Sequence, residues 1–199
     1  MSNNKSEIIQ SQKNLANKMI TKLRAFDPYC ILAGGAPRDW YFNEIATDLD
    51  FYVYQQYEGA TLISVEKRLH SLGFEYSLCG ANDIDFKMYE KNKDIKAVFN
   101  ILNVEFPIQI IVLKTPTFKI VDSFPMSICK AWYLPERGVV TTGDFNISVK
   151  TGTIFITNKI YANADKYVNK IISKFKDKFD FAPSKEVALA RYFNGGLNV

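Results

Sequence analysis

Two pairs of residues near the start of the chain have the type and spacing to bind a charged ligand. Gly34 and Gly35, the glycine pair, end a short apolar run, where the backbone can turn tightly and present bare N–H groups. A helix expected directly after them adds the positive end of its dipole, which favours phosphate. Asp48 and Asp50, the aspartate pair, lie two apart on an expected strand, so their carboxylates share one face and can hold a divalent cation.

A phosphate-binding turn beside two carboxylates is the equipment for chemistry at a nucleoside triphosphate (NTP). Divalent cations, Mg²⁺ or Mn²⁺, would activate a hydroxyl that attacks the α-phosphorus and would screen the leaving pyrophosphate. A second acidic pair, Asp83 and Asp85, lacks preceding glycines, and we interpret it as the polar start of a hairpin strand. Trp40 is expected to pack under the glycine pair, with stacking on a base as the alternative.

The spacing of these motifs resembles that of a known family. The head domain of tRNA nucleotidyltransferases (CCA-adding enzymes) and bacterial poly(A) polymerases, in the DNA polymerase beta superfamily, has a GG-x-V-R-D motif followed by D-x-D-F. The matching residues here are Gly34-Gly35, Arg38-Asp39 and Asp48-x-Asp50-Phe51. An isolated GG or DxD would be weak evidence, but the two together with Arg-Asp at fixed spacing are specific. The close match covers about 20 residues.

The resemblance implies an enzyme and a set of roles. It implies that the chain transfers a nucleoside monophosphate from an NTP to an acceptor hydroxyl and releases pyrophosphate. The glycine pair would hold the triphosphate and the aspartate pair would bind magnesium. Arg38 and Asp39 would steady the loop or reach the nucleotide.

The chain also departs from the family pattern. Asn43 and Glu44 stand where the family commonly has a glycine and a basic residue, and the segment 123–133 lacks the family's Arg-Arg-Asp, which contacts the ribose. A third carboxylate is expected on a neighbouring strand. Glu105 is the candidate, because Gln109, at the centre of the strand that follows, is neutral.

Hydrophobic periodicity outlines the elements that must position these residues. Helices are expected at 6–26, 37–42, 61–72, 115–121, in the lysine-rich segment up to about 179, and within 180–199. Strands are expected at 29–33, 49–54, 74–78, 84–89, 97–104, 106–113, 127–134 and 145–156. Together they predict an α/β (α+β) fold, the nucleotidyltransferase fold by resemblance, with a small mixed sheet flanked by helices and a C-terminal basic helix. Residues 1–180 would form the domain, and 181–199 a short helix and tail.

Positive charge is concentrated near the C-terminus. The whole chain has a net charge of +4, yet the segment 150–178 has seven lysines and only two aspartates. Apolar residues recur there at helical spacing, so a helix would have one buried and one lysine-bearing face. That face is either an ordinary solvated surface or a contact surface for RNA phosphates. The candidate contacts are Lys159, Lys166, Lys170 and Lys174.

Composition narrows the class of protein and leaves the acceptor open. The chain is 47% hydrophobic and 23% charged over 199 residues, which excludes a disordered protein. No apolar run could span a bilayer, and three separated cysteines indicate reduced thiols, so we expect a cytoplasmic protein without a membrane partner. An RNA 3′ end is the first choice of acceptor. A protein or small-molecule acceptor, a binding module without turnover, and a protein partner stay open.

Overall fold

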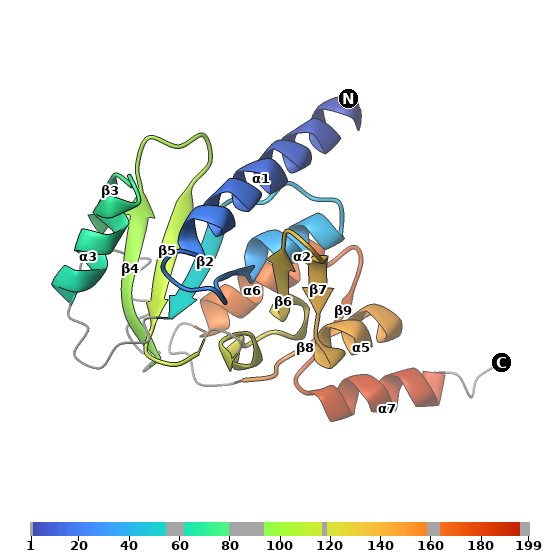
Figure 1. Cartoon of the computed structure of the whole chain (residues 1–199). Helices are drawn as coiled ribbons and strands as arrows, with labels where there is room; N and C mark the ends of the chain where they lie inside the picture. The colour runs from blue at the N-terminus through green and yellow to red at the C-terminus, as the bar shows by residue number, and fades with distance from the viewer. Residues whose placement is uncertain (1, 55–61, 80–93, 117–118, 159–163, 196–199) are drawn as a thin grey trace.

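Two β-sheets form the framework of the computed structural model, which describes residues 2–54, 62–79, 94–116, 119–158 and 164–195 (Figure 1). In that part of the chain the larger sheet has seven strands. Its order is β3 (Tyr76–Leu78), β4 (Ile95–Ile101), β5 (Ile108–Leu113), β2 (Leu49–Tyr54), β1 (Ile31–Ala33), β6 (Ala131–Leu134) and β7 (Gly138–Thr141). The strands β8 (Thr153–Phe155) and β9 (Asp180–Ala182) form a separate parallel pair.

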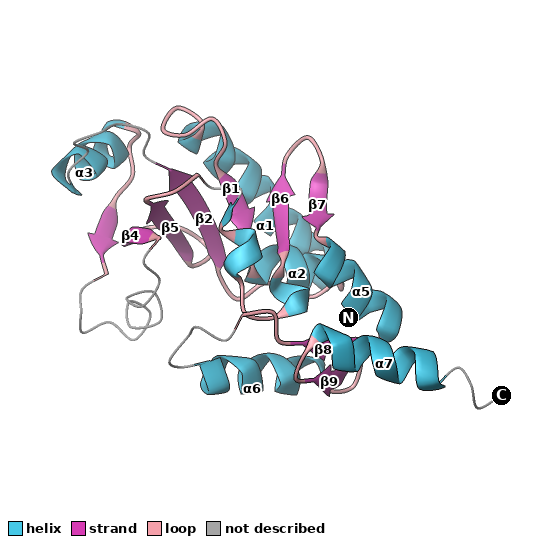
Figure 2. Cartoon of the chain, turned by 90° about the horizontal axis from the view of Figure 1, so that it is seen from below, coloured by secondary structure: helices cyan, strands magenta, loops and turns pink. Residues whose placement is uncertain are grey.

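Helices pack on both faces of the larger sheet. Side chains of α1 (Ser2–Leu23) and α3 (Leu62–Ser71) form one apolar core with the sheet, and those of α6 (Ala164–Phe175) form a second core on the other face. The remaining elements are α2 (Gly35–Tyr41), α5 (Gly143–Thr151), α7 (Lys185–Gly195) and the 3₁₀ turns η2 (Val121–Ser123) and η3 (Ser127–Cys129). Seen from below, α6, β8, β9 and α7 run along one side of the molecule (Figure 2). The predicted fold class, a mixed sheet flanked by helices, is confirmed.

Strand β2 lies at the centre of the sheet, with β5 parallel on one side and β1 antiparallel on the other. Its bounds are those expected from the sequence. Leu49, Phe51 and Val53 alternate along it and are fully buried in the core under α1 and α3. Because side chains alternate along a strand, Asp50 lies on the opposite face of β2. Tyr52, on that same face, belongs to the second core.

A buried carboxylate, that of Asp27, ties the beginning of β1 to the end of β2. Its Oδ1 accepts the N–H of Tyr29 at 2.9 Å and its Oδ2 accepts the N–H of Tyr54 at 2.8 Å. Burial raises the pKa of Asp27 above its ordinary value, although these two hydrogen bonds act against that rise. The carboxylate therefore fixes the register of the two strands that precede and follow the candidate site.

The prediction of a strand at 145–156 is wrong for most of that range. Residues Gly143–Thr151 form α5, and only Thr153–Phe155 form a strand. The Thr142 side chain accepts the N–H of Phe145 at the start of this helix, and Gly152, with φ of 62°, ends it. These are standard helix start and stop signals, which the β-branched composition of the segment obscured.

The basic C-terminal segment is helical over a shorter range than its apolar spacing indicated. Val168, Ile171 and Phe175 of α6 are buried as that spacing predicted. The division into 1–180 and 181–199 stays a prediction, and its boundary falls within β9. Residues 84–89, expected as a strand, lie outside the described residues together with Asp83. Within the described ranges no helix is both long and apolar enough to cross a membrane.

All three cysteines lie inside the protein as free thiols. Cys30 is at the beginning of β1, Cys79 follows β3, and Cys129 ends η3. Burial is the largest cause that raises the pKa of Cys30, to about 12, and the nearby Asp27 carboxylate adds to it.

Candidate active site

The glycine pair forms a tight turn between β1 and α2. Gly34 has φ of 87° and ψ of −116°, a backbone conformation that is strained for residues with a side chain, and its N–H donates to the Ala131 carbonyl of β6 at 3.0 Å. Gly35 is the first residue of α2. The turn is therefore fixed to the neighbouring strand, and the next residues enter a helix, as the sequence predicted.

The turn lies directly against Asp48. A Cβ atom added to Gly35 would lie 3.7 Å from Oδ1 of Asp48 and 3.8 Å from Nη2 of Arg38. Asp48 immediately precedes β2 and Asp50 is its second residue, so the two carboxylates project to the same face of the sheet. Both residues are partly buried. The structure thus brings together the glycine pair and the aspartate pair.

Strand β5, which pairs with β2, has a neutral residue opposite Asp50. Gln109 of β5 is the register partner of Asp50, and its Nε2 donates to Oδ1 of Asn100 on β4 at 3.0 Å. Glu105 lies in an exposed bend between β4 and β5. Among the residues that the structure describes, no three His, Cys, Asp or Glu side chains gather as a metal site. The structure therefore does not bring Glu105 to the aspartate pair, and its role as a third carboxylate stays a prediction.

Arg38 and Asp39 are buried and bind each other. Nε of Arg38 donates to Oδ1 of Asp39 at 2.8 Å, and Nη1 reaches Sγ of Cys129 at 3.3 Å. The guanidinium also lies over the ring of Phe175 of α6, 5.3 Å from its centre. Of the two roles expected for these residues, the contacts favour steadying the loop.

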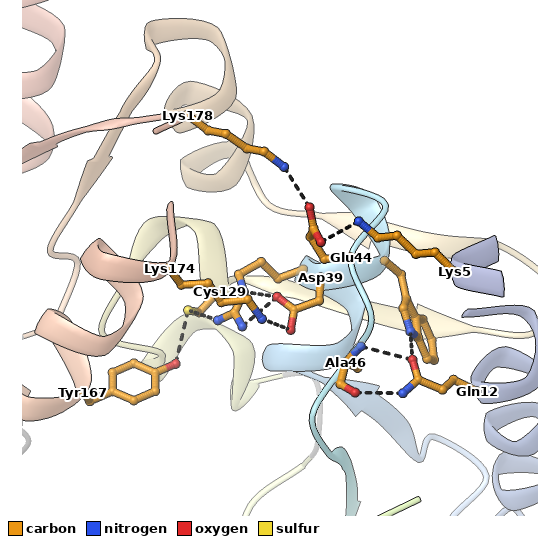
Figure 3. A network of polar contacts seen from close by, with 11 residues as sticks. Lys5, Gln12, Asp39, Glu44, Ala46, Cys129, Tyr167, Lys174 and Lys178 are labelled. Carbon is orange, nitrogen blue, oxygen red and sulfur yellow. Dashed lines mark hydrogen bonds and ion pairs between the residues drawn. The ribbon is translucent and has the colours of Figure 1, made fainter. Parts of the chain in front are cut away.

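Helix α6 closes this network from the C-terminal side (Figure 3). Nζ of Lys174 donates to Oδ2 of Asp39 at 2.7 Å, and the Tyr167 hydroxyl donates to Sγ of Cys129 at 3.2 Å. Burial raises the pKa of Tyr167 well above its ordinary value, and Cys129 and the nearby Asp50 carboxylate add to the rise. The basic helix therefore lies next to both the loop and the aspartate pair.

A second group of contacts holds the segment between α2 and β2. Glu44 accepts hydrogen bonds from Lys5 at 2.7 Å and from Lys178 at 3.1 Å, and these bonds lower its pKa. Asn43 has φ of 56°, a conformation that asparagine tolerates better than most residues. The two departures from the family motif therefore have local structural reasons.

Gln12 is a supporting residue that the sequence interpretation missed. It is fully buried in α1, donates to the Ala46 carbonyl at 2.8 Å, and accepts the Ala46 N–H at 3.1 Å and the Trp40 indole N–H at 3.0 Å. The ring of Trp40 packs edge-on against Tyr133. The packing interpretation of Trp40 is confirmed. A polar residue on the apolar stripe of α1 was the available signal for Gln12.

The candidate RNA contacts occupy different positions. Lys166 and Lys170 are exposed on α6, whereas the Lys174 ammonium is held by Asp39. Lys159 lies outside the described residues, as does the second acidic pair at Asp83 and Asp85. Of the three candidate lysines that the structure describes, Lys166 and Lys170 are thus available on the surface of the helix.

The comparisons with known proteins concern the fold. No family model and no curated protein matches the sequence. A structure of a CCA-adding enzyme with ATP matches with a TM-score of 0.56 and 16% identity over 94% of this chain. The Thermotoga maritima CCA-adding enzyme in complex with tRNA matches with a TM-score of 0.55 and 15% identity over 96%. The chain has the nucleotidyltransferase fold. It spans 42% and 45% of those two chains, so it corresponds to less than half of either enzyme.

Within this nucleotidyltransferase fold the described geometry has a definite chemical capacity. The start of α2 lies beside Asp48, Asp50 follows two residues later on the strand, and the buried Arg38 lies next to the same turn. The helix start can bind phosphate oxygens, and the two carboxylates can bind a divalent cation.

Proposed function

We propose that this chain is a nucleotidyltransferase that moves a nucleoside monophosphate from an NTP to an acceptor hydroxyl, with release of pyrophosphate. The observation that carries the proposal is how close Gly35 lies to Asp48: a Cβ atom added to Gly35 would be 3.7 Å from Oδ1 of Asp48. This distance supports the proposal, because the turn that would bind phosphate lies against a carboxylate that shares a face with Asp50. The fold shared with CCA-adding enzymes supports the same reaction class.

The residues have separate roles in this proposal. The turn formed by the glycine pair binds and orients the triphosphate through backbone N–H groups at the start of α2. The aspartate pair fits Mg²⁺ or Mn²⁺, because both cations prefer carboxylate oxygens and two such groups share one face. A bound cation would increase the acidity of the attacking hydroxyl and neutralise charge on pyrophosphate. Arg38 and Asp39 keep the turn in place, so that the triphosphate is held in line with the acceptor.

The acceptor that we propose is an RNA 3′ end. We propose that the reaction takes place in the cytoplasm. Lys166 and Lys170 are exposed on the helix that lies next to the aspartate pair, and their charges suit a phosphate backbone. One of the matching CCA-adding enzymes is in complex with tRNA. A protein partner could supply the contacts that the missing Arg-Arg-Asp would have made.

Binding without turnover is the second candidate function, and Gln109 favours it. This neutral side chain occupies the register position beside Asp50, where a carboxylate would help to activate an acceptor hydroxyl. A site with two acidic residues can retain nucleotide affinity while the chemical step is slow.

One labelling experiment separates these functions. The protein is incubated with each α-labelled NTP, Mg²⁺ and total RNA, and the label is followed into RNA, protein or neither. We expect label in RNA, and we expect Asp48→Asn and Asp50→Asn each to reduce it at least about a hundredfold, as loss of a metal ligand does. Asp180→Asn, an exposed aspartate on β9, is the matched control.

The outcomes of this experiment differ for each function. Label in protein would transfer the proposal to a protein acceptor. No label, together with a rise in melting temperature on addition of NTP and Mg²⁺, would establish the binding module. Full labelling by Asp48→Asn would refute the assignment of the metal ligands.

A further inference from the structure

The ammonium of Lys174 binds a buried carboxylate of α2 at the candidate site, although Lys174 itself lies on the surface of its helix. Its Nζ lies 2.7 Å from Oδ2 of Asp39, whose side chain is only 3% exposed, whereas the Lys174 side chain is 32% exposed. The two residues are 135 positions apart in the chain. This contact joins α6 to α2, across the candidate site, through a carboxylate that solvent hardly reaches.

The contact continues from Asp39 to the phosphate-binding turn. Asp39 binds Arg38 through Oδ1 at 2.8 Å, and Nη2 of Arg38 lies 3.8 Å from the position of a Gly35 side chain. Oδ1 of Asp48 lies 3.7 Å from that same position. Lys174 is thus bound through Asp39 to Arg38, and the guanidinium of Arg38 lies beside the same glycine as the carboxylate of Asp48, one candidate metal ligand.

The three charges of Arg38, Asp39 and Lys174 sum to a positive value. Arg38 is always protonated, so Asp39 neutralises it and the buried pair alone has no net charge. Lys174 adds one positive charge and uses the second oxygen of Asp39, which keeps that carboxylate turned toward α2. The cluster of three then has a net charge of +1 beside a turn that is suited to anionic phosphates.

We infer that Lys174 is a positioning residue of the nucleotide site, and that it acts through Asp39 and Arg38 on the glycine turn and on Asp48. This role rests on the proposed function and replaces the expectation that Lys174 contacts RNA. The lysines of α6 would thus have two different roles. Lys174 binds the helix to the candidate site, and the exposed Lys166 and Lys170 can contact RNA.

The test compares nucleotide binding with RNA binding in matched variants. Lys174→Met should raise the NTP concentration that gives half of the Mg²⁺-dependent thermal stabilisation by about tenfold, equivalent to about 1.4 kcal/mol. Lys174→Arg, which keeps the charge and the reach to Asp39, should restore it to within about twofold. Lys176→Met, an exposed lysine two residues further on, removes the same charge without the contact and should leave NTP binding unchanged.

A double substitution tests whether the effect passes through Asp39. Asp39→Asn should also weaken NTP binding, and adding Lys174→Met to it should produce no further loss, because the two residues form one interaction. A general loss of folding would appear as a lower melting temperature without nucleotide.

Two results would overturn this inference. In the first, Lys174→Met leaves NTP binding unchanged and lowers the slope of log RNA affinity against log salt by about one, as loss of a phosphate contact does. In the second, the double variant binds NTP more weakly than Asp39→Asn alone. A wild-type protein that neither binds nor turns over NTP would refute the proposed function itself, which is a different result from wild-type binding that Lys174→Met does not alter.

Discussion

The two neighbouring glycines of the turn differ at the level of single residues. Gly34 needs glycine because of its backbone conformation, with φ of 87°, and a side chain there would meet only ordinary contacts with Phe124. Gly35 has no such backbone constraint, but a side chain there would face Asp48 and Arg38. The backbone at Gly34 therefore requires glycine, whereas a side chain at Gly35 would fit at ordinary contact distance beside the Asp48 carboxylate.

This difference predicts opposite outcomes for two alanine substitutions. Gly34→Ala should lower the free energy of unfolding by about 1–2 kcal/mol, the cost of a left-handed backbone at a residue with a Cβ atom. Gly35→Ala should change it by less than about 0.5 kcal/mol and instead reduce the thermal stabilisation by NTP and Mg²⁺. Urea unfolding and melting curves measure the two effects. Equal stability losses in both variants would contradict the assignment.

At the scale of elements, α1 supports the site although it contributes no candidate catalytic group. Through Gln12 it binds both backbone groups of Ala46, and Asp48 follows only two residues later. Gln12 also binds the indole of Trp40 in α2. The helix therefore fixes the segment that carries the chain from the glycine turn to the aspartate pair.

Removing the amide of Gln12 should consequently destabilise the protein more than an ordinary core substitution. Gln12→Leu leaves the N–H and carbonyl of Ala46 and the N–H of Trp40 without their partners, and each unsatisfied buried group costs about 1–3 kcal/mol. We expect a loss of at least about 3 kcal/mol in urea unfolding. Thr21→Leu, in the same helix with an exposed side chain, is the control. A loss below about 1 kcal/mol would show that water replaces the amide.

Local patterns in the sequence predicted the elements that carry the site, but not the contacts that join them. The alternation in Leu49–Tyr54 and the glycine pair at the start of α2 are strong local signals. Strand β2 has the expected bounds, and α2 begins two residues earlier than expected, at Gly35. The segment Gly143–Thr151 was misread, because its capping residues are weaker signals than its composition. The ion pair of Lys174 with Asp39 depends on how two cores pack against the sheet, which no local pattern encodes.

At the scale of the whole molecule, the sheet separates two apolar cores, and the candidate site lies on one face only. Asp50 shares its face with α6 and η3, whereas α1 and α3 fill the other side. The site is therefore built from segments near both ends of the described chain. Nucleotide binding and overall stability should be coupled for this reason, since the same helix that borders the site also completes a core.

The three buried cysteine thiols make local or global unfolding of the protein measurable, because a reagent can reach them only when the fold opens. Cys30, Cys79 and Cys129 lie in different parts of the fold, and none is exposed. A thiol reagent such as Ellman's reagent should thus react at least about a hundredfold more slowly with the native chain than in urea, which corresponds to an opening free energy of about 2.8 kcal/mol or more. Immediate reaction without denaturant would contradict the burial. In a variant that retains only Cys129, the rate of this reaction would measure how often α6 separates from η3, because Tyr167 of α6 contacts that thiol. NTP with Mg²⁺ should lower the rate.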